Sequence, residues 1–273
     1  WIAHGLTQAG RMGTPEEPED GVAVSLDRVL VIIPTYNEAA NIGPITARVR
    51  AAVPSADILV VDDNSPDGTG DLADELAAAD QQIHVLHRKV KDGLGGAYLA
   101  GFAWGLDEGY DVLIEHDADG SHRPEDVPRL LERLKTADVV KGSRWIPGGK
   151  VVYWPKSREL LSRGGNLWVR LWLGIPVADA TGGFAAWRAD TLRGMDLAGV
   201  EAHGYGFQVD LAWRAVRNGF TVAEVPIEFA DRQFGDSKMS QRIVVEAMLL
   251  TTRWGIARRL GQLKALVTGR RTR

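Results

Sequence analysis

Two aspartates one residue apart, Asp117 and Asp119 in the stretch DADGSH, follow the apolar run at residues 112–114. A carboxylate at the end of a buried strand costs desolvation free energy unless a cation or hydrogen-bond donors pair with it. In an extended segment, residues i and i+2 point to the same side, so the two carboxylates can converge on one point. A hard divalent cation that carries bound phosphates takes one or two carboxylates and fills its remaining positions with phosphate oxygens and water. The pair therefore predicts a metal and diphosphate site.

A helix start is the alternative interpretation of the same stretch. A helix beginning near Pro124 could take Asp119 or Ser121 as its N-cap, because short polar side chains accept hydrogen bonds from the first free backbone N–H groups. This interpretation accounts for Ser121, but it leaves Asp117 without a role.

The elements that would position these acids are short β-branched runs alternating with longer helical stretches. The runs predict strands at residues 29–33, 58–61, 83–86, 112–114 and 139–140. The stretches between them predict helices at residues 41–53, 69–79, 95–108 and 125–135. Continuous apolar strands alternating with helices indicate an α/β fold with a mainly parallel sheet and helices on both faces. Ligands of such sheets bind outside the carboxyl ends of the strands, so we expect the site in the turns that follow them.

Three further turns offer groups that could bind a ligand. In PTYNE, Tyr36 presents an aromatic face that the structural role of a turn does not require. In VVDDNSPDGT, Asp63 ends a strand and can accept hydrogen bonds from a base or a sugar. The stretch GLGGAYLAG at residues 93–101 resembles a dinucleotide fingerprint only loosely, and we favour a tight turn and close packing at a helix start.

Composition limits the possible functions. The chain of 273 residues has 32 Lys and Arg against 36 Asp and Glu, a net charge of −4, so the molecule as a whole does not resemble a nucleic-acid-binding protein. The absence of cysteine excludes disulfides, thiolate metal sites and a cysteine nucleophile. We divide the chain into a flexible leader or linker at residues 1–27, a domain at 28–240, and an amphipathic basic helix and tail at 241–273.

Motifs along most of the chain, from about Val29 to Met239, resemble those of dolichol- or polyprenol-phosphate mannose synthases, in order and in spacing. These enzymes are inverting family 2 glycosyltransferases with a GT-A fold, and the bacterial polyprenol monophosphomannose synthases belong among them. The motifs are PTYNE, VVDDNSPDGT, GLGGAYLAG, DADGSH, GSRW, SRGGN, TGGF, GYGFQVD and VPIEFADRQFGDSKM. The resemblance implies transfer of mannose from GDP-mannose to a polyprenyl phosphate, with Mg²⁺ or Mn²⁺ as cofactor. Many family 2 enzymes share the early motifs, whereas SRGGN, GYGFQ and the final set are more selective.

The resemblance also implies roles for single residues. The metal would meet Asp117, Asp119 and Ser121, and the catalytic set would be Asp119, Arg144 and Arg163. The nucleotide sugar would contact Pro34, Tyr36, Glu38, Val61, Asp63, Asp117, Ala118, Asp119, Ser121, Arg144, Gln208, Arg232 and Lys238. Asp179 and Asp210 would line the mannose or acceptor site with Gln208. Two positions depart from the family: some relatives have Gln in place of Ser121, and many have Leu in place of Gly120.

The acceptor chemistry agrees with this set. A phosphate is already ionised at neutral pH, so the transfer needs no strong general base. It needs cations that hold the acceptor, and the planar guanidinium of Arg suits phosphate better than Lys does. Candidates are Arg144, Arg158 and Arg163, whereas Arg232 and Lys238 would contact the donor diphosphate.

Two segments have the composition of a membrane interface. Residues 160–177 and 244–260 mix apolar side chains with Trp and Arg, as headgroup-level helices do, although an amphipathic helix packed on the core would look similar. We expect peripheral attachment to the cytoplasmic face of a membrane, directly or through a separate or fused membrane-protein partner.

Two other functions stay open. The donor could be UDP-glucose or another sugar nucleotide, or the chain could be a sugar-nucleotide-binding module without turnover. Asp119 together with Arg144 and Arg163 argues against the binding module.

Overall fold

The computed structural model describes residues 26–200, 205–231 and 241–268. The predicted leader lies almost wholly outside these residues, and so do Arg232 and Lys238.

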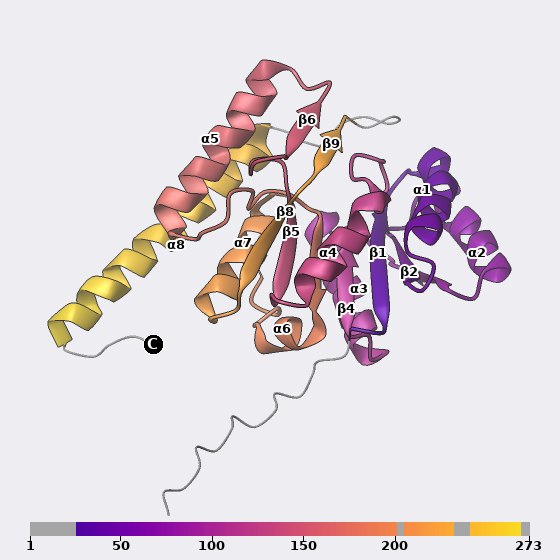
Figure 1. Ribbon diagram of the computed structural model, residues 1–273, viewed down its shortest axis with the longest axis horizontal. Helices are drawn as coiled ribbons and strands as arrows, with labels where there is room; N and C mark the ends of the chain where they lie inside the picture. The colour runs from indigo at the N-terminus through magenta and orange to yellow at the C-terminus, as the bar shows by residue number, and fades with distance from the viewer. Residues whose placement is uncertain (1–25, 201–204, 232–240, 269–273) are drawn as a thin grey trace, which may run out of the picture.

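A seven-stranded sheet forms the centre of the molecule (Figure 1). In spatial order it contains β3 (Ile83–His87), β2 (Asp57–Asp62), β1 (Val29–Thr35), β4 (Val112–Glu115), β7 (Ala185–Arg188), β5 (Val139–Ser143) and β8 (Val222–Pro226). Within this sheet only β7 runs antiparallel to its neighbours. The five predicted strands are confirmed, each longer by one to three residues. A second, two-stranded sheet pairs β6 (Lys150–Val152) with β9 (Glu228–Ala230).

Helices cover both faces of the large sheet, as predicted. The α-helices of the described residues are α1 (Ala39–Ala52), α2 (Thr69–Ala79), α3 (Gly93–Asp107), α4 (Val127–Leu134), α5 (Lys156–Leu173), α6 (Ala189–Gly194), α7 (Tyr205–Arg217) and α8 (Gln241–Thr268), of which α5 and α8 lie beyond the sheet (Figure 1). Successive residues of β1 point to opposite faces. Val31 and Ile33 belong to the apolar cluster that includes α1, α2 and α4, whereas Leu30 and Ile32 belong to the one that includes α3, α6 and α7. The four predicted helices correspond to α1 to α4.

Helix α3 approaches the sheet unusually closely because it carries glycine where it crosses the strands. A Cβ on Gly101 would lie 2.6 Å from the Ile32 side chain, and one on Gly105 would lie 2.7 Å from Leu113. Gly93 begins the helix with a φ of +74°, a conformation that side chains disfavour. The interpretation of GLGGAYLAG as a turn and close packing is therefore confirmed.

Helices α5 and α8 lie side by side at the end of the molecule opposite α1 and α2 (Figure 1). A third apolar cluster joins α5, α7 and α8, in which Trp213 stacks on Trp254 with ring centroids 5.4 Å apart. Among the described helices, none is long and apolar enough to cross a membrane.

Candidate active site

The strand order places a topological switch point between β1 and β4. From β1 the chain builds β2 and β3 on one side, and β4 then joins β1 on the other side. This reversal of direction is the point at which open α/β sheets bind their ligands. Strand β5 runs parallel to β4, because both are antiparallel to β7 between them. The segments that follow β1, β2, β4 and β5 therefore share one edge, and all of the predicted turns up to Arg144 lie there.

The predicted nucleoside residues come together across β1 and β2. Pro34 pairs with Val61 in the parallel register, and the backbone N–H of Asp63 donates to Thr35. The buried carboxylate of Asp63 accepts a hydrogen bond of 2.5 Å from Arg88. Burial raises the pKa of Asp63, and the nearby Arg88 charge offsets only part of that rise.

Two further members of the nucleoside set lie just after β1. The Tyr36 ring has the ammonium group of Lys91 3.5 Å from its centroid, a cation–π contact. Glu38 is buried and accepts a hydrogen bond of 2.6 Å from the amide of Asn41.

The acid pair follows β4, next to β1. The Tyr98 hydroxyl, from α3, donates to Oδ1 of Asp117 at 3.0 Å. Oδ1 of Asp119 accepts two hydrogen bonds from Ser121, at 3.0 Å from the backbone N–H and 2.5 Å from the hydroxyl. Ala118, between the two acids, is buried. Ser121 thus acts on Asp119 in this structure, as a hydrogen-bond donor to the predicted metal ligand.

The helical segment begins at Pro124, as the helix-start interpretation expected, but neither Asp119 nor Ser121 is its N-cap. The following helical segment begins with a 3₁₀ turn at Pro124–Asp126, and its N-cap position is Arg123, without a side-chain capping bond. Gly120 has a φ of +75°, so a Leu at this position would be strained in this turn. The turn geometry therefore depends on glycine at this position.

Two buried histidines flank the acids. Burial lowers the pKa of His116 to about 4 and that of His122 to about 3, so both rings are neutral at neutral pH. Nδ1 of His122 lies 3.6 Å from Oδ2 of Asp117, too far for a hydrogen bond, and a neutral ring makes no ion pair there. The histidines therefore supply a polar but uncharged wall beside Asp117.

Behind the acids lies a buried polar network that the sequence motifs did not reveal. Glu115 accepts hydrogen bonds from the Trp187 indole at 2.7 Å and from the Gln208 amide at 2.5 Å. Burial raises the pKa of Glu115 to about 7, against the opposing effect of Lys141 and these donors. Lys141, itself fully buried, donates to the carbonyl of Gly182 at 2.8 Å. The network ties Gln208, a predicted sugar contact, to the strand that carries the acids.

Arg144 follows β5 and is held by a buried ion pair. Its guanidinium donates twice to Asp179, both at 2.7 Å, and once to Thr181 at 3.1 Å. Burial raises the pKa of Asp179, but the Arg144 charge and hydrogen bonds outweigh this and lower it below the usual value. Both carboxylate oxygens of Asp179 therefore bind and orient Arg144.

Three arginines near the end of β5 make cation–π contacts with two shared tryptophan rings. Arg144 and Arg163 both lie over the Trp145 ring, at 5.4 and 4.3 Å from its centroid. Arg144 and Arg158 both lie over Trp154, at 5.5 and 3.9 Å. The cluster gathers three guanidinium groups on aromatic rings, and each also pairs with a carboxylate, of Asp179, Asp231 or Glu159.

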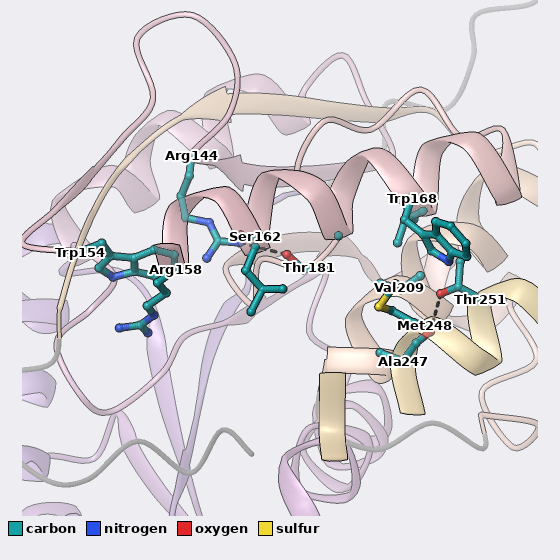
Figure 2. A pocket seen from close by; sticks show the side chains of 13 residues that line it. Arg144, Trp154, Arg158, Ser162, Trp168, Thr181, Val209, Ala247, Met248 and Thr251 are labelled. Atoms are coloured by element: carbon teal, nitrogen blue, oxygen red, sulfur yellow. Dashed lines mark hydrogen bonds between the residues drawn. The ribbon is translucent and has the colours of Figure 1, made fainter. Parts of the chain in front are cut away.

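A pocket opens beside this cluster, between α5, α7 and α8 (Figure 2). Figure 2 shows Arg144, Trp154 and Arg158 at one end and Trp168, Met248 and Thr251 at the other. The remaining lining residues are Leu161, Ser162, Gly165, Val169, Thr181, Val209 and Ala247. The pocket is thus cationic at one end and apolar along its length.

The pocket selects different residues of α5 from those the resemblance implied. Arg158 and Ser162 line it, whereas Arg163 does not; Arg163 is half exposed and pairs with Glu159 at 2.8 Å. The spacing of the lining residues 158, 162, 165 and 169 follows one face of a helix, a signal that was present in the sequence.

The donor set fits a divalent cation that carries phosphates. Among the described residues, no cluster of three or more His, Cys, Asp or Glu could hold a metal ion by itself. Two carboxylates, with phosphate oxygens and water completing the shell, are the arrangement that Mg²⁺ commonly uses.

The segment after β9 leads from the acids to the undescribed part of the chain. Ala230 donates its backbone N–H to the carbonyl of Ser121, and Asp231 pairs with Arg158 at 3.0 Å. Arg232 and Lys238, the predicted diphosphate contacts, lie outside the described residues. Asp210, the remaining residue of the implied sugar or acceptor set, pairs with Arg214 at 2.8 Å.

Curated relatives match nearly the whole chain. An undecaprenyl-phosphate mannosyltransferase from Micrococcus luteus is 58% identical over 238 residues, which are 87% of this chain and 98% of the relative. A polyprenol monophosphomannose synthase from Mycolicibacterium smegmatis is 51% identical over 264 residues, 94% of this chain and 100% of the relative.

Solved structures agree on the fold. Glucosyl-3-phosphoglycerate synthase from Mycobacterium tuberculosis, in complex with Mn²⁺, UDP and phosphoglyceric acid, superimposes with a TM-score of 0.61 at 21% identity, covering 83% of this chain and 78% of that one. Mannosyl-3-phosphoglycerate synthase from Rubrobacter xylanophilus gives a TM-score of 0.57 at 20% identity, covering 90% and 76%. The mixed, mainly parallel sheet is the GT-A fold. The sequence model of the family described as "Glycosyl transferase family 2" matches residues 30–194. Because this match covers more than half of the chain and the curated relatives agree with it, the chain belongs to the family 2 glycosyltransferases.

Proposed function

We propose that the protein transfers mannose from GDP-mannose to a polyprenyl phosphate with inversion, and so makes a lipid-linked mannose donor. The observation that carries the proposal is the pocket beside Arg144, which is cationic at one end and apolar along its length. A polyprenyl phosphate has the same division, an anionic head on an apolar chain. The two curated relatives, named for undecaprenyl phosphate and polyprenol, support this acceptor.

The donor half of the reaction belongs at the edge formed by β1, β2 and β4. Pro34, Tyr36 and Asp63 would hold the nucleoside, and Gln208 would meet the sugar. Asp117 and Asp119 would hold Mg²⁺ or Mn²⁺, with Ser121 fixing Asp119. When bound, such an ion supplies charge stabilisation for the leaving diphosphate.

The acceptor half belongs to Arg144 and Arg158. Asp179 fixes the plane of the Arg144 guanidinium, and Asp231 holds Arg158 at the mouth of the pocket. Arginines held in this way can grip a phosphate without losing further side-chain entropy on binding. An ionised phosphate oxygen can then attack the sugar carbon directly, on the face opposite the leaving diphosphate, which inverts the configuration.

Membrane access is supported by exposed apolar stripes on two adjacent helices. On α5 the stripe is Leu160, Leu167 and Leu171, and on α8 it is Val245, Leu249, Ile256 and Leu260. Each set repeats at helical spacing and so shares one helix face. We propose that these stripes rest on the cytoplasmic face of a membrane, with residues 28–240 as the catalytic domain and 241–273 as its attachment, with or without a membrane-protein partner.

Separately labelled GDP-mannose and UDP-glucose test the proposal directly. The protein is incubated with Mg²⁺, a polyprenyl phosphate and one donor, and label in the lipid phase is counted. We expect label from GDP-mannose only, and none with the Asp119→Ala variant. Label from UDP-glucose alone would refute the mannose assignment, and label from neither donor would favour a binding module.

A further inference from the structure

The hydroxyl of Tyr98, on α3, makes a hydrogen bond to the first carboxylate of the acid pair. Tyr98 is fully buried in α3, and its ring stacks near Phe102 and Phe207, with centroids 6.3 and 6.2 Å away. The hydroxyl lies 3.0 Å from Oδ1 of Asp117. An ionised carboxylate only accepts hydrogen bonds, so the hydroxyl is the donor. The aromatic stack therefore aims one donor at one carboxylate oxygen.

The rest of Asp117 is constrained at the backbone. Its carbonyl oxygen lies 2.9 Å from Nδ1 of His116, and its Oδ2 lies 3.6 Å from Nδ1 of His122. Yet its side chain remains 28% exposed, in contrast to the buried rings around it. Asp117 thus reaches solvent while one oxygen is tied to the protein interior.

We propose that Tyr98 is a positioning residue, whose hydroxyl holds the Asp117 carboxylate in the orientation in which it meets the metal and the donor diphosphate. The inference rests on the proposed function, because that function gives Asp117 its metal. Hydrogen bonds that orient a ligating carboxylate typically change metal affinity ten- to hundredfold when they are removed. Tyr98 itself is too deeply buried to coordinate the ion.

The chain provides a matched control in Tyr110. Tyr110 is also buried, and its hydroxyl donates to a carboxylate, Oδ2 of Asp57, at 2.5 Å. Asp57 is the first residue of β2 and lies at the amino edge of the sheet, away from the acid pair. Tyr98→Phe and Tyr110→Phe therefore each remove a hydroxyl that donates to a carboxylate from a buried ring, and each keeps the ring itself.

The test measures GDP binding by calorimetry at a series of Mn²⁺ concentrations, with thermal unfolding to confirm that each variant is folded. We expect Tyr98→Phe to need about ten- to hundredfold more Mn²⁺ than the wild type to reach half of its full GDP affinity. Tyr110→Phe should match the wild type. If Tyr98 acts through Asp117, the double variant Tyr98→Phe/Asp117→Asn should bind like Asp117→Asn alone.

Two results would overturn the inference while leaving the proposed function in place. One is a Tyr98→Phe variant with the Mn²⁺ dependence of the wild type. The other is a double variant weaker than Asp117→Asn by the full factor that Tyr98→Phe shows alone. GDP binding by the wild type that ignores Mn²⁺ would overturn both the metal role and the inference. Mn²⁺-dependent GDP binding without transfer of labelled mannose would contradict the proposed function and leave the role of Tyr98 standing.

Discussion

Arg158 and Arg163 stand five residues apart on α5 and face different surroundings. Arg158 lines the pocket, is about three-quarters buried and pairs with Asp231. Arg163 is half exposed and pairs with Glu159 one helical turn away. The resemblance to polyprenol-phosphate mannose synthases favoured Arg163, whereas the pocket favours Arg158. The two arginines can be distinguished by their effect on acceptor binding.

We expect Arg158→Ala to raise the KM for polyprenyl phosphate about ten- to hundredfold, because a hydrogen bond to a charged group contributes about 1.5–3 kcal/mol. Arg163→Ala removes an exposed ion pair and should change the same KM by less than about threefold. The measurement is steady-state kinetics with a short-chain polyprenyl phosphate at saturating donor. A larger effect from Arg163→Ala would contradict the assignment of the pocket.

Residue types at the site were more predictable than their partners. Asp117, Asp119, Tyr36 and Asp63 were recognisable because the turns that follow the strands are short and carry few other functional groups. Glu115 was not, because a single acid inside an apolar run says nothing about the Trp187 and Gln208 donors that come from elements 72 and 93 residues away. Asp179 could be named from its motif, but its pairing with Arg144 depends on the placement of a separate loop.

At the scale of elements, the parallel strands β1 to β5 could be predicted from the sequence, whereas the antiparallel strand β7 could not. Strands β1 to β5 contain β-branched runs, and each interval between successive runs is long enough for only one helix. Strand β7, of sequence AAWR, is too short and too rich in alanine to be recognised, and it alone reverses direction within the large sheet. Antiparallel insertion of β7 between β4 and β5 is a tertiary choice that local pattern does not encode.

The stripes on α5 and α8 give a prediction for membrane attachment. Leu167 and Leu171 on α5 are 54% and 64% exposed. Burying a Leu side chain contributes about 1.5–3 kcal/mol, so Leu167→Asp with Leu171→Asp should weaken liposome binding by more than about tenfold. Co-sedimentation with vesicles measures this, and Leu72→Asp on α2, an exposed Leu at the opposite end of the molecule, is the control. Equal loss in the control would contradict a role for this face.

At the scale of the whole molecule, the buried pair of Arg144 and Asp179 should shape acid stability. The pKa of Asp179 is lowered, so the pair stabilises the folded protein above the ordinary carboxyl value of 3.8 and loses this contribution as the pH falls further. Removing one member of a buried pair leaves an unpaired charge, which costs about 3–5 kcal/mol.

We therefore expect Asp179→Asn to lower the free energy of unfolding by about 3 kcal/mol or more at pH 7, with a difference from the wild type that shrinks below pH 3.8. Urea unfolding across this pH range measures it. Asp190→Asn breaks the exposed pair with Arg193 and should cost less than about 1 kcal/mol. A difference for Asp179→Asn that stays constant down to low pH would show that the carboxylate charge is not what stabilises the fold.

The bare surface of α3 has a consequence for the reaction centre. Gly101 lies one turn beyond Tyr98, and its missing side chain lets the helix rest directly on Ile32. A methyl group there would lie 2.6 Å from the buried Ile32 side chain, so either that side chain or the helix that carries Tyr98 would have to shift. The packing of α3 on the sheet therefore sets the position of the Tyr98 hydroxyl relative to Asp117. A substitution at Gly101 would lower the catalytic rate from a position outside the proposed donor and acceptor sites.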